Sequence, residues 1–326
     1  MNRILYLLIV FVLIILFSCQ KDNPGGGLAN TSAYRITEWL AYEDGTQDFK
    51  ITISYEGYKV KQMLGYDYTM KDQWRLSSKH ELSYPETNKA INTCYTFNPT
   101  DSVWSREFKE EVLLDGEKVV EYKFILWNHT AQEWKPVSRR TLTYDTDLLT
   151  EETYYSFSSQ SESWENDEKY VFQYVDGTLS NVDWLFWNDP EWTLVSQYFY
   201  EYRNGQLDWV RRIHAVQGVW DTIAKEQLSW NGNLLEIVNR YQRDFGGWVL
   251  RSNVNYDYDS DGNIKEWVTT YVPGGSTTRM QFEYEAGQGN FRQVRFTSFN
   301  ESLDWYLPYP TASAIDQFTN LHQLTK

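Results

Sequence analysis

Seven tryptophans recur at a nearly constant spacing, and this spacing constrains the fold more than any other feature of the chain. The first four are 30 residues apart and the remaining three follow at intervals of 28: Trp74, Trp104, Trp134, Trp164, Trp192, Trp220 and Trp248. Self-similarity at such a period is typical of repeat architectures, in which each unit packs on its neighbours. We therefore expect residues 33–326 to form one repetitive domain.

Each repeat has the pattern of one β-hairpin. The positions eight and ten residues after each of these tryptophans are apolar or aromatic in all seven repeats, which is the period of a strand with one packed face. Dipeptides such as Asp176-Gly177 and Asn204-Gly205 follow, and they tolerate the positive φ angles of tight turns. We predict an all-β fold with about nine hairpins, hence roughly 18 strands, in an extended antiparallel meander that is curved or spiralling. A closed up-and-down β-barrel is the alternative.

The seven spaced tryptophans are expected to form a structural ladder on the packed side of this sheet. A buried Trp removes roughly 150–250 Å² from water, so Trp192→Ala or Trp220→Ala is expected to cost roughly 3–5 kcal/mol. Trp184 and Trp187 lie outside the spacing and have opposite strand parity. One of these two should face away from the packed side, so we treat both as candidate binding aromatics.

The first 20 residues have the pattern of a processing signal. Arg3 provides a positive start, and residues 4–17 form an apolar run that is too short for a comfortable membrane span. The ending Leu16-Phe17-Ser18-Cys19 resembles a bacterial lipobox. The resemblance implies a signal peptide over residues 1–18 and lipidation of Cys19.

The residues after the lipobox indicate where the protein is displayed. Gln20, Lys21 and Asp22 resemble the export signal of Bacteroidota surface lipoproteins. That resemblance implies a lipid-anchored protein of the outer membrane that faces the cell exterior. Residues 19–32 contain the acylated cysteine and a Gly-rich stretch, which we expect to act as a flexible tether.

The acidic composition narrows the class of partner. The chain has a net charge of −15, which disfavours binding to nucleic acid because phosphates require Lys and Arg. Its only cysteine besides Cys19 is Cys94, so no intramolecular disulfide is expected once Cys19 is acylated. Cys94 lies in a strand-like run and is expected to be a small buried residue.

One acidic stretch, "YDYDSDGNI" at residues 256–264, invites comparison with a calcium-binding loop. Asp257, Asp259 and Asp261 match the first ligand positions, but Lys265 and Val268 stand where later ligands belong. We therefore predict a hairpin turn and no metal site.

The same stretch resembles the YD repeat of RHS-type proteins, clearly over residues 248–264 and more loosely over 134–246. The resemblance implies a long sheet of hairpins and no particular activity.

No pattern in the sequence indicates catalysis or a cofactor. The four histidines are scattered, and nucleophile-elbow, P-loop and dinucleotide motifs are missing from the sequence. The triplets around Ser102 and Thr222 resemble the short O-glycosylation motif of Bacteroidota envelope proteins.

We therefore expect a non-catalytic envelope lipoprotein that acts as a structural module or as a binding module for a glycan or a protein partner. An accessory to a secreted carbohydrate-active enzyme and an outer-membrane β-barrel are the alternatives.

Overall fold

The computed structural model describes residues 34–57, 59–69, 73–115, 118–146, 148–216, 219–232 and 234–286. The expectations for residues 1–18, Cys19, Gln20, Lys21, Asp22 and the tether lie outside these residues, as does the end of the last expected hairpin.

The described chain forms 18 strands and no helix, in agreement with the predicted class and strand number. They are β1 (Tyr34–Glu43), β2 (Thr46–Glu56), β3 (Lys59–Tyr68), β4 (Trp74–Glu86), β5 (Lys89–Asn98), β6 (Val103–Asp115), β7 (Lys118–Asn128), β8 (Glu133–Asp145), β9 (Leu148–Ser158), β10 (Ser163–Val175), β11 (Thr178–Asn188), β12 (Glu191–Arg203), β13 (Gln206–Val216), β14 (Val219–Asn231), β15 (Leu234–Asp244), β16 (Gly247–Tyr258), β17 (Ile264–Tyr271) and β18 (Thr277–Ala286). Strand β1 was not recognised in the sequence. Within these residues no helix is long and apolar enough to cross a membrane.

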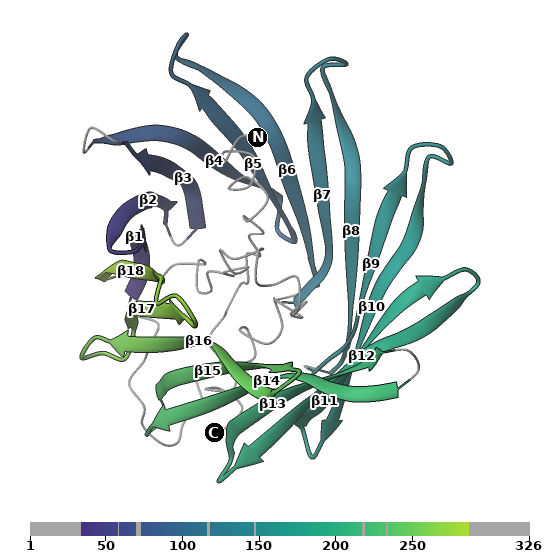
Figure 1. Cartoon of the computed structure of the whole chain (residues 1–326). Coiled ribbons are helices and arrows are strands. Elements are labelled where there is room, and N and C mark those ends of the chain that lie inside the picture. The colour runs from purple at the N-terminus through teal and green to yellow at the C-terminus, as the bar shows by residue number, and fades with distance from the viewer. Residues whose placement is uncertain are drawn as a thin grey trace, which may run out of the picture.

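The sheet closes on itself. Every strand pairs antiparallel with the strands before and after it, and β1 pairs with both β2 and β18 (Figure 1). Leu40, for example, lies opposite Lys50 on one side and Gln281 on the other. Closure leaves no unpaired edge on which another strand could add. The closed barrel is therefore confirmed, and the open meander that we favoured from the sequence is not what the chain forms.

One β-bulge interrupts each strand that carries a spaced tryptophan. In β4 the residues Leu76 and Ser78 pair with consecutive residues of β3, which leaves Ser77 as the extra residue. The other repeats have an extra residue at the equivalent position after their spaced tryptophan, for example Glu107 in β6 and Ile223 in β14. A bulge reverses the alternation of side chains between the two faces. A tryptophan before the bulge therefore lies on the opposite face from the apolar positions after it.

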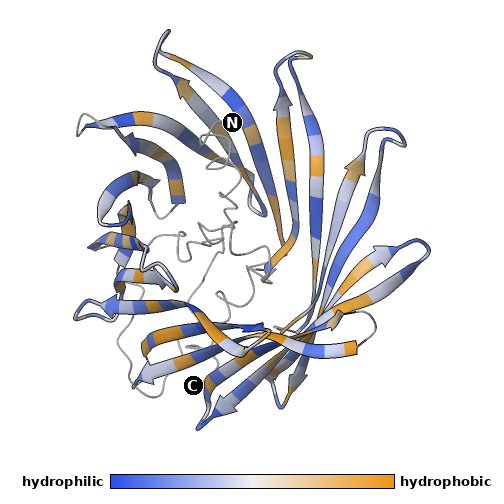
Figure 2. Ribbon diagram, in the orientation of Figure 1, coloured by the Kyte–Doolittle hydropathy of each residue, from blue (hydrophilic) through white to orange (hydrophobic). Residues whose placement is uncertain are grey.

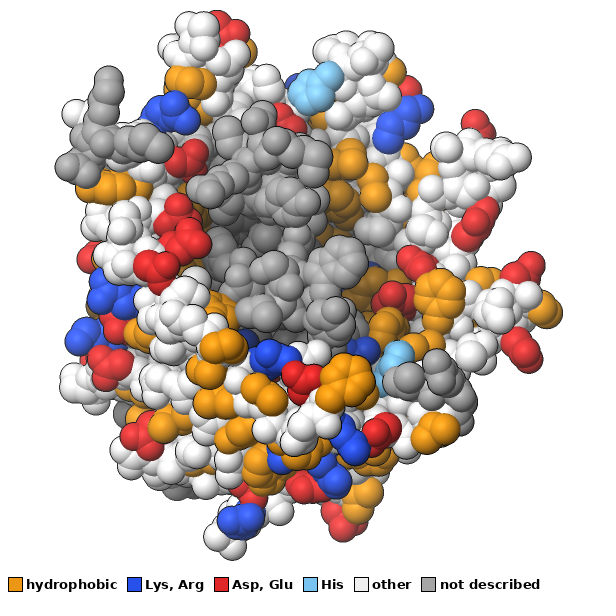
Figure 3. Space-filling model, in the orientation of Figure 1, with side chains coloured by type: hydrophobic (Ala, Val, Ile, Leu, Met, Phe, Trp, Pro, Cys, Tyr) orange, Lys and Arg blue, Asp and Glu red, His pale blue; other side chains and the backbone are white. Residues whose placement is uncertain are grey.

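The inner face of the barrel carries the core. Met63 is 0% exposed and Trp39 is 2% exposed, as only side chains on the concave side of a single closed sheet can be. Two buried apolar clusters share this face, one centred on β1–β8 with β18 and the other on β10–β16. Figure 2 shows hydrophobic and hydrophilic residues interspersed along the strands, and Figure 3 shows hydrophobic side chains along the inside of the ring.

The outer face is polar and carries many ion pairs, whereas the pairs Arg140–Glu152 and Arg240–Glu226 lie on the inner face. Lys79–Glu81, Lys109–Glu111 and Lys169–Glu151 have N–O distances of 2.7, 2.8 and 3.1 Å and lie on the face opposite the core. The packed side of the strands that the sequence predicts is thus the inner face of the barrel, and the water-facing side is the outer face.

Tyrosine hydroxyls fasten neighbouring strands at the end of the barrel where even-numbered strands turn into odd-numbered ones. Tyr174 in β10 donates to the carbonyl of Leu149 in β9 at 2.9 Å. Six further side chains donate to a carbonyl of the preceding strand, five through a tyrosine hydroxyl and Trp230 through its indole NH: Tyr55 to Ile36, Tyr84 to Val60, Tyr144 to Val119, Trp230 to Leu207, Tyr258 to Leu235, and Tyr284 to Ile264. Five of these seven side chains, Tyr84, Tyr144, Tyr174, Trp230 and Tyr258, are the aromatic positions ten residues after a spaced tryptophan, and their packing was correctly predicted.

Candidate functional site

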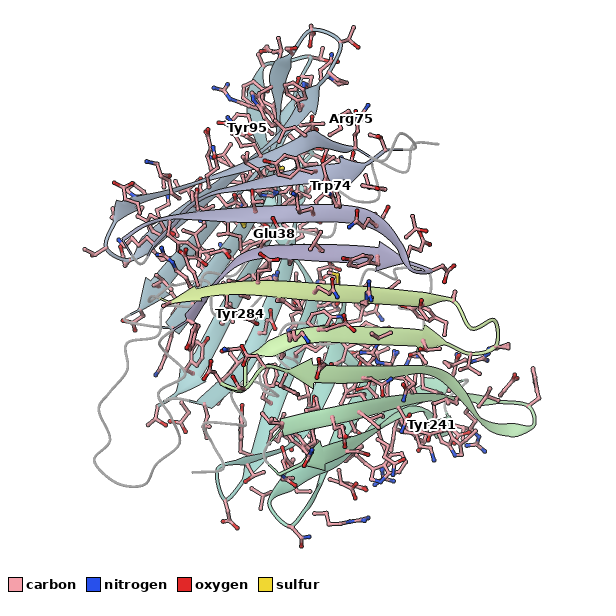
Figure 4. The ribbon with its side chains drawn as sticks, turned by 90° about the vertical axis from the view of Figure 1, so that its left-hand side faces the viewer. Glu38, Trp74, Arg75, Tyr95, Tyr241 and Tyr284 are labelled. Carbon is pink, nitrogen blue, oxygen red and sulfur yellow. The ribbon has the colours of Figure 1, made fainter. Side chains whose placement is uncertain are left out.

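The seven spaced tryptophans lie on the outer face, near the end of the barrel where odd-numbered strands turn into even-numbered ones. We call this set the tryptophan belt. Figure 4 shows Trp74 and Tyr241 toward this end of the strands and Tyr284 toward the other. The belt is half-buried over most of its length, whereas Trp220 and Trp248 are 43% and 39% exposed. The expected ladder on the packed side is therefore misplaced, because the bulge after each tryptophan turns it away from the core.

Five belt tryptophans each meet an aromatic ring from the preceding strand. The ring centroids are 5.0–5.1 Å apart and the rings are strongly inclined, which is the favoured edge-to-face arrangement. The pairs are Tyr68–Trp74, Phe97–Trp104, Trp127–Trp134, Phe157–Trp164 and Trp187–Trp192. Each pair closes one hairpin near its tip, so these tryptophans have a structural role on the outer wall.

A cation from two strands earlier covers each of these five rings. Lys79 of β4 lies 5.0 Å from the centroid of Trp104 in β6, and Lys169 lies 4.9 Å from that of Trp192. Lys50, Lys109 and Arg139 cover Trp74, Trp134 and Trp164 in the same way. A carboxylate within 4 Å accompanies each of the five cations. The repeating unit is thus a ring pair, a cation and an acid.

The unit changes over β13–β16. Trp220 lies opposite Ala215, and Trp248 lies opposite Arg243. Neither therefore has the aromatic partner on the preceding strand that the other five belt tryptophans have. Gln197 occupies the position from which a cation would cover Trp220. Among the described residues no ring or cation contacts Trp220, and it is the most exposed member of the belt.

Lys225 sits at the centre of this changed segment. Its ammonium lies 5.0, 5.4 and 4.5 Å from the ring centroids of Trp209, Tyr241 and Trp248. We call Trp209, Trp220, Lys225, Tyr241 and Trp248 the rim patch.

Trp184 and Trp187 lie on opposite faces, as their parity predicted. Trp184 faces inward, where it stacks on Tyr170 with ring centroids 6.2 Å apart and planes inclined by 4°. Trp187 faces outward and forms a belt pair with Trp192. Both are half-buried, and among the tryptophans that the structure describes the exposed ones are Trp220 and Trp248 instead. The sequence does carry this signal, because Ala215 and Arg243 interrupt a row of aromatic residues.

The two candidate glycosylation residues are on the outside of the barrel. Ser102 is exposed in the turn before β6, with a φ of 57°. Thr222 is half-buried on the outer face of β14, between Trp220 and Lys225.

The inner face holds a second candidate site, a polar cluster that sequence analysis did not find. His80 Nδ1 is 3.1 Å from Asn92 Nδ2, and His80 Nε2 is 3.6 Å from Cys94 Sγ. Glu110 accepts hydrogen bonds from Asn92 at 2.7 Å and from Tyr122 at 2.6 Å. The pairing of strands β4–β7 brings these residues together from scattered positions in the sequence.

The protonation states of this cluster oppose thiol chemistry. Burial raises the pKa of the Cys94 thiol well above its ordinary value, with nearby Glu110 adding to the effect. Burial also lowers the pKa of His80 to about 4. A reactive Cys–His pair needs a thiolate beside an imidazolium. Both groups here are held neutral, so the cluster is suited to packing rather than to nucleophilic attack.

A further inner contact joins Ser196, Arg212 and His214. Ser196 Oγ lies 2.6 Å from His214 Nδ1 and accepts a hydrogen bond from Arg212 Nε at 3.3 Å. Burial lowers the pKa of His214, and the charge of Arg212 adds to this shift. Ser196 is fully buried, so no substrate could reach its oxygen in this conformation.

The acidic loop after β16 forms a turn, as predicted. Asp259 Oδ1 accepts hydrogen bonds from the backbone NH groups of Asp261 and Asn263, and Asp259 Oδ2 accepts one from Asn263 Nδ2, all at 2.9 Å. Desolvation opposes these bonds, yet together they hold the pKa of Asp259 below its usual range. Among the described residues no three His, Cys, Asp or Glu side chains are grouped so that they could hold a metal ion.

No family model and no curated protein matches the chain. Among solved structures, a protein of unknown function from Bacteroides fragilis is 15% identical, with a TM-score of 0.36, over 38% of this chain and 91% of that one. A porin-like protein from Bacteroides uniformis is 11% identical, with a TM-score of 0.38, over 77% of this chain and 96% of that one. A TcdB2–TccC3 structure is 13% identical, with a TM-score of 0.24, over 78% of this chain and 19% of that one.

Proposed function

We propose that this protein is a non-catalytic lipoprotein of the cell envelope, anchored through Cys19 and displayed on the outer membrane surface, where it binds a glycan. The observation that carries the binding role is Trp220, an exposed indole on the outer wall with no ring or cation partner in the described structure. A flat aromatic ring on a sheet face offers a stacking surface for the apolar side of a sugar ring.

The polarity of the outer wall supports a barrel that stands in water. A transmembrane barrel presents an apolar band about 25 Å tall to the lipid, and each Lys or Arg at the bilayer midplane costs roughly 2–4 kcal/mol. Here the outer wall carries ion pairs such as Lys109–Glu111 and Lys123–Glu121, and the two buried apolar clusters face inward. This arrangement disfavours the alternative of an outer-membrane β-barrel and suits a barrel held at the membrane by a lipid.

The lipid anchor can be tested with labelled palmitate in a host that processes bacterial lipoproteins. The protein should incorporate the label and fractionate with the outer membrane, and Cys19→Ala should abolish both. Protease added to whole cells should degrade the protein if it faces outward. A Cys19→Ala protein that remains membrane-bound would contradict the anchor.

The binding role is tested by probing a glycan array with the full-length protein in mild detergent. We expect binding that Trp220→Ala weakens at least tenfold, whereas Trp134→Ala, a ring-paired belt residue, leaves it unchanged. An array without signal would contradict glycan binding and favour a protein partner. Signal that survives Trp220→Ala would move the contact away from the rim patch.

A further inference from the structure

We propose that the rim patch recognises a carboxylate-bearing sugar within an acidic glycan, with Lys225 pairing with the carboxylate and Trp220 and Trp248 stacking on sugar rings. This inference rests on the proposed function and specifies the chemical class of its ligand.

Lys225 differs from the other belt cations in lacking an acid. Lys79, Lys109 and Lys169 each hold a carboxylate at 2.7–3.1 Å, whereas no carboxylate of the described residues lies within ion-pair distance of Lys225. Its ammonium contacts three aromatic rings instead. The positive charge of Lys225 is therefore available to an anion from outside, in a chain whose net charge is −15.

A glutamine stands at the position in this repeat that carries an acid in two other repeats. Glu81 and Glu111 stand two residues after Lys79 and Lys109, and Gln227 takes that place after Lys225. An amide in place of the carboxylate removes the neutralising charge and keeps the side-chain length. A cation without its internal partner raises the local potential and attracts anions over roughly a Debye length.

Amide side chains extend the patch on the same face. Gln227 lies opposite Trp209 on one side and Asn239 on the other, and Asn239 lies opposite Asn253. Asn253 Nδ2 donates to Asn239 Oδ1 at 2.8 Å. Each amide has both donors and an acceptor, which suits the hydroxyl groups of a sugar. The strip therefore combines rings for stacking, amides for hydroxyls and one cation for a carboxylate.

The length of the strip indicates an oligosaccharide rather than a single sugar. Trp220 and Gln227 lie on one strand with a bulge between them, so their backbone positions are on the order of 20 Å apart. Trp248 lies two strands away from Trp220, which adds roughly 10 Å of width. A flat surface of this size can hold several sugar units side by side.

The experiment titrates the full-length protein in mild detergent with oligomers of galacturonate, glucuronate and mannuronate, in an isothermal calorimeter. Each oligomer is paired with its methyl ester, which keeps the sugar and removes the charge. Polyglutamate tests carboxylates without sugar. We expect at least one uronate oligomer to bind at least tenfold more tightly than its ester and than polyglutamate, with affinity falling as salt is raised.

Two lysine variants test whether Lys225 is the residue that contacts the carboxylate. Lys225→Gln should weaken uronate binding at least tenfold and leave binding of the ester unchanged, whereas Lys109→Gln, which removes an acid-paired belt cation, should change neither. Melting temperatures confirm that each variant is folded, and the ester comparison on the unmodified protein needs no variant.

Several results would each overturn the inference. They are no binding of any uronate oligomer, equal binding of acid and ester, and a Lys225→Gln protein with unchanged affinity. Equal binding of acid and ester would leave the proposed glycan binding standing, because only the requirement for charge would have failed. Equal binding of polyglutamate would mean a general anion site and would also overturn the specificity for sugar.

Discussion

The inner and outer faces of the barrel use tryptophan in different ways, although the same strands build both. Trp39 on the inner face is buried against the apolar core. The belt tryptophans on the outer face remain half-buried or exposed, and they meet rings and cations near the hairpin tips. Regular spacing therefore marks a position within the hairpin, and the bulge that follows decides which face that position occupies.

The largest expected effect belongs to the inner face. Trp39→Ala should reduce the free energy of unfolding by about 3–5 kcal/mol, because it leaves a cavity in a core that closes β1 against β2 and β18. Urea denaturation followed by far-UV circular dichroism measures this loss. A reduction below about 1 kcal/mol would mean that the inner face is not the packed one.

Acid should destabilise the inner face through His80. Its pKa is lowered to about 4 by burial, below the ordinary value of 6.5, so the unfolded chain takes up a proton at a higher pH than the folded barrel. The contribution of His80 to stability is therefore present above pH 6.5 and is lost as the pH falls from 6.5 to 4. The full loss is about 3 kcal/mol, from roughly 1.4 kcal/mol per pKa unit.

The variant His80→Gln isolates this contribution from that of carboxylates such as Glu168, whose pKa is raised by burial. The difference in unfolding free energy between pH 7 and pH 4 should be smaller in His80→Gln than in the unmodified protein. His129→Gln, which changes a largely exposed histidine, should keep the original pH dependence. Identical slopes for His80→Gln and the unmodified protein would contradict a neutral buried His80.

Substitutions at two belt residues compare a tryptophan that packs against another ring with one that does not. Trp134→Ala should cost about 2 kcal/mol, because it removes a half-buried ring, its edge contact with Trp127 and the site of Lys109. Trp220→Ala should change stability by less than about 0.5 kcal/mol, since its ring has no such partners. Thermal melts of the two variants measure the difference. Equal losses of stability would mean that ring-paired belt tryptophans such as Trp134 do not differ from Trp220 in their structural role.

The smallest effect concerns the tyrosine bonds at the other end of the barrel. Tyr174→Phe should cost about 1 kcal/mol, because the Leu149 carbonyl loses its donor. Tyr202→Phe is the matched control, since its hydroxyl is buried at the equivalent position without a hydrogen-bond partner. That change should be neutral or slightly stabilising. Equal losses in denaturant titrations would mean that these hydroxyl bonds do not hold the strands together.

Sequence periodicity predicted the hairpins well because their signals are local. Turn dipeptides such as Asn204-Gly205 and apolar positions such as Tyr198 and Tyr200 lie within one repeat, and the structure places them as expected. Closure was not predictable, since β1 and β18 are some 240 residues apart and neither strand has a sequence pattern that indicates the other as its pairing partner. A strand pairing of that range depends on the accumulated twist and curvature of all the intervening hairpins.

The candidate site was predictable in part. Parity correctly separated Trp184 from Trp187, because no bulge falls between them in β11. The same reasoning misplaced Trp220, since the extra residue Ile223 follows it and carries no sequence signature. The inner cluster of His80, Asn92 and Glu110 could not have been found, because it forms only when three neighbouring strands settle into register.

The most direct test of the account is the closure of the ring, on which the assignment of inner and outer faces depends. Leu40→Cys and Gln281→Cys place two thiols directly opposite each other on β1 and β18, at the separation that a disulfide can bridge. Mild oxidation of this double variant should produce a rapid intramolecular cross-link visible on a non-reducing gel, whereas Leu40→Cys with Thr193→Cys should give none. A double variant at Leu40 and Gln281 that stays reduced while the protein is folded would contradict the closed barrel.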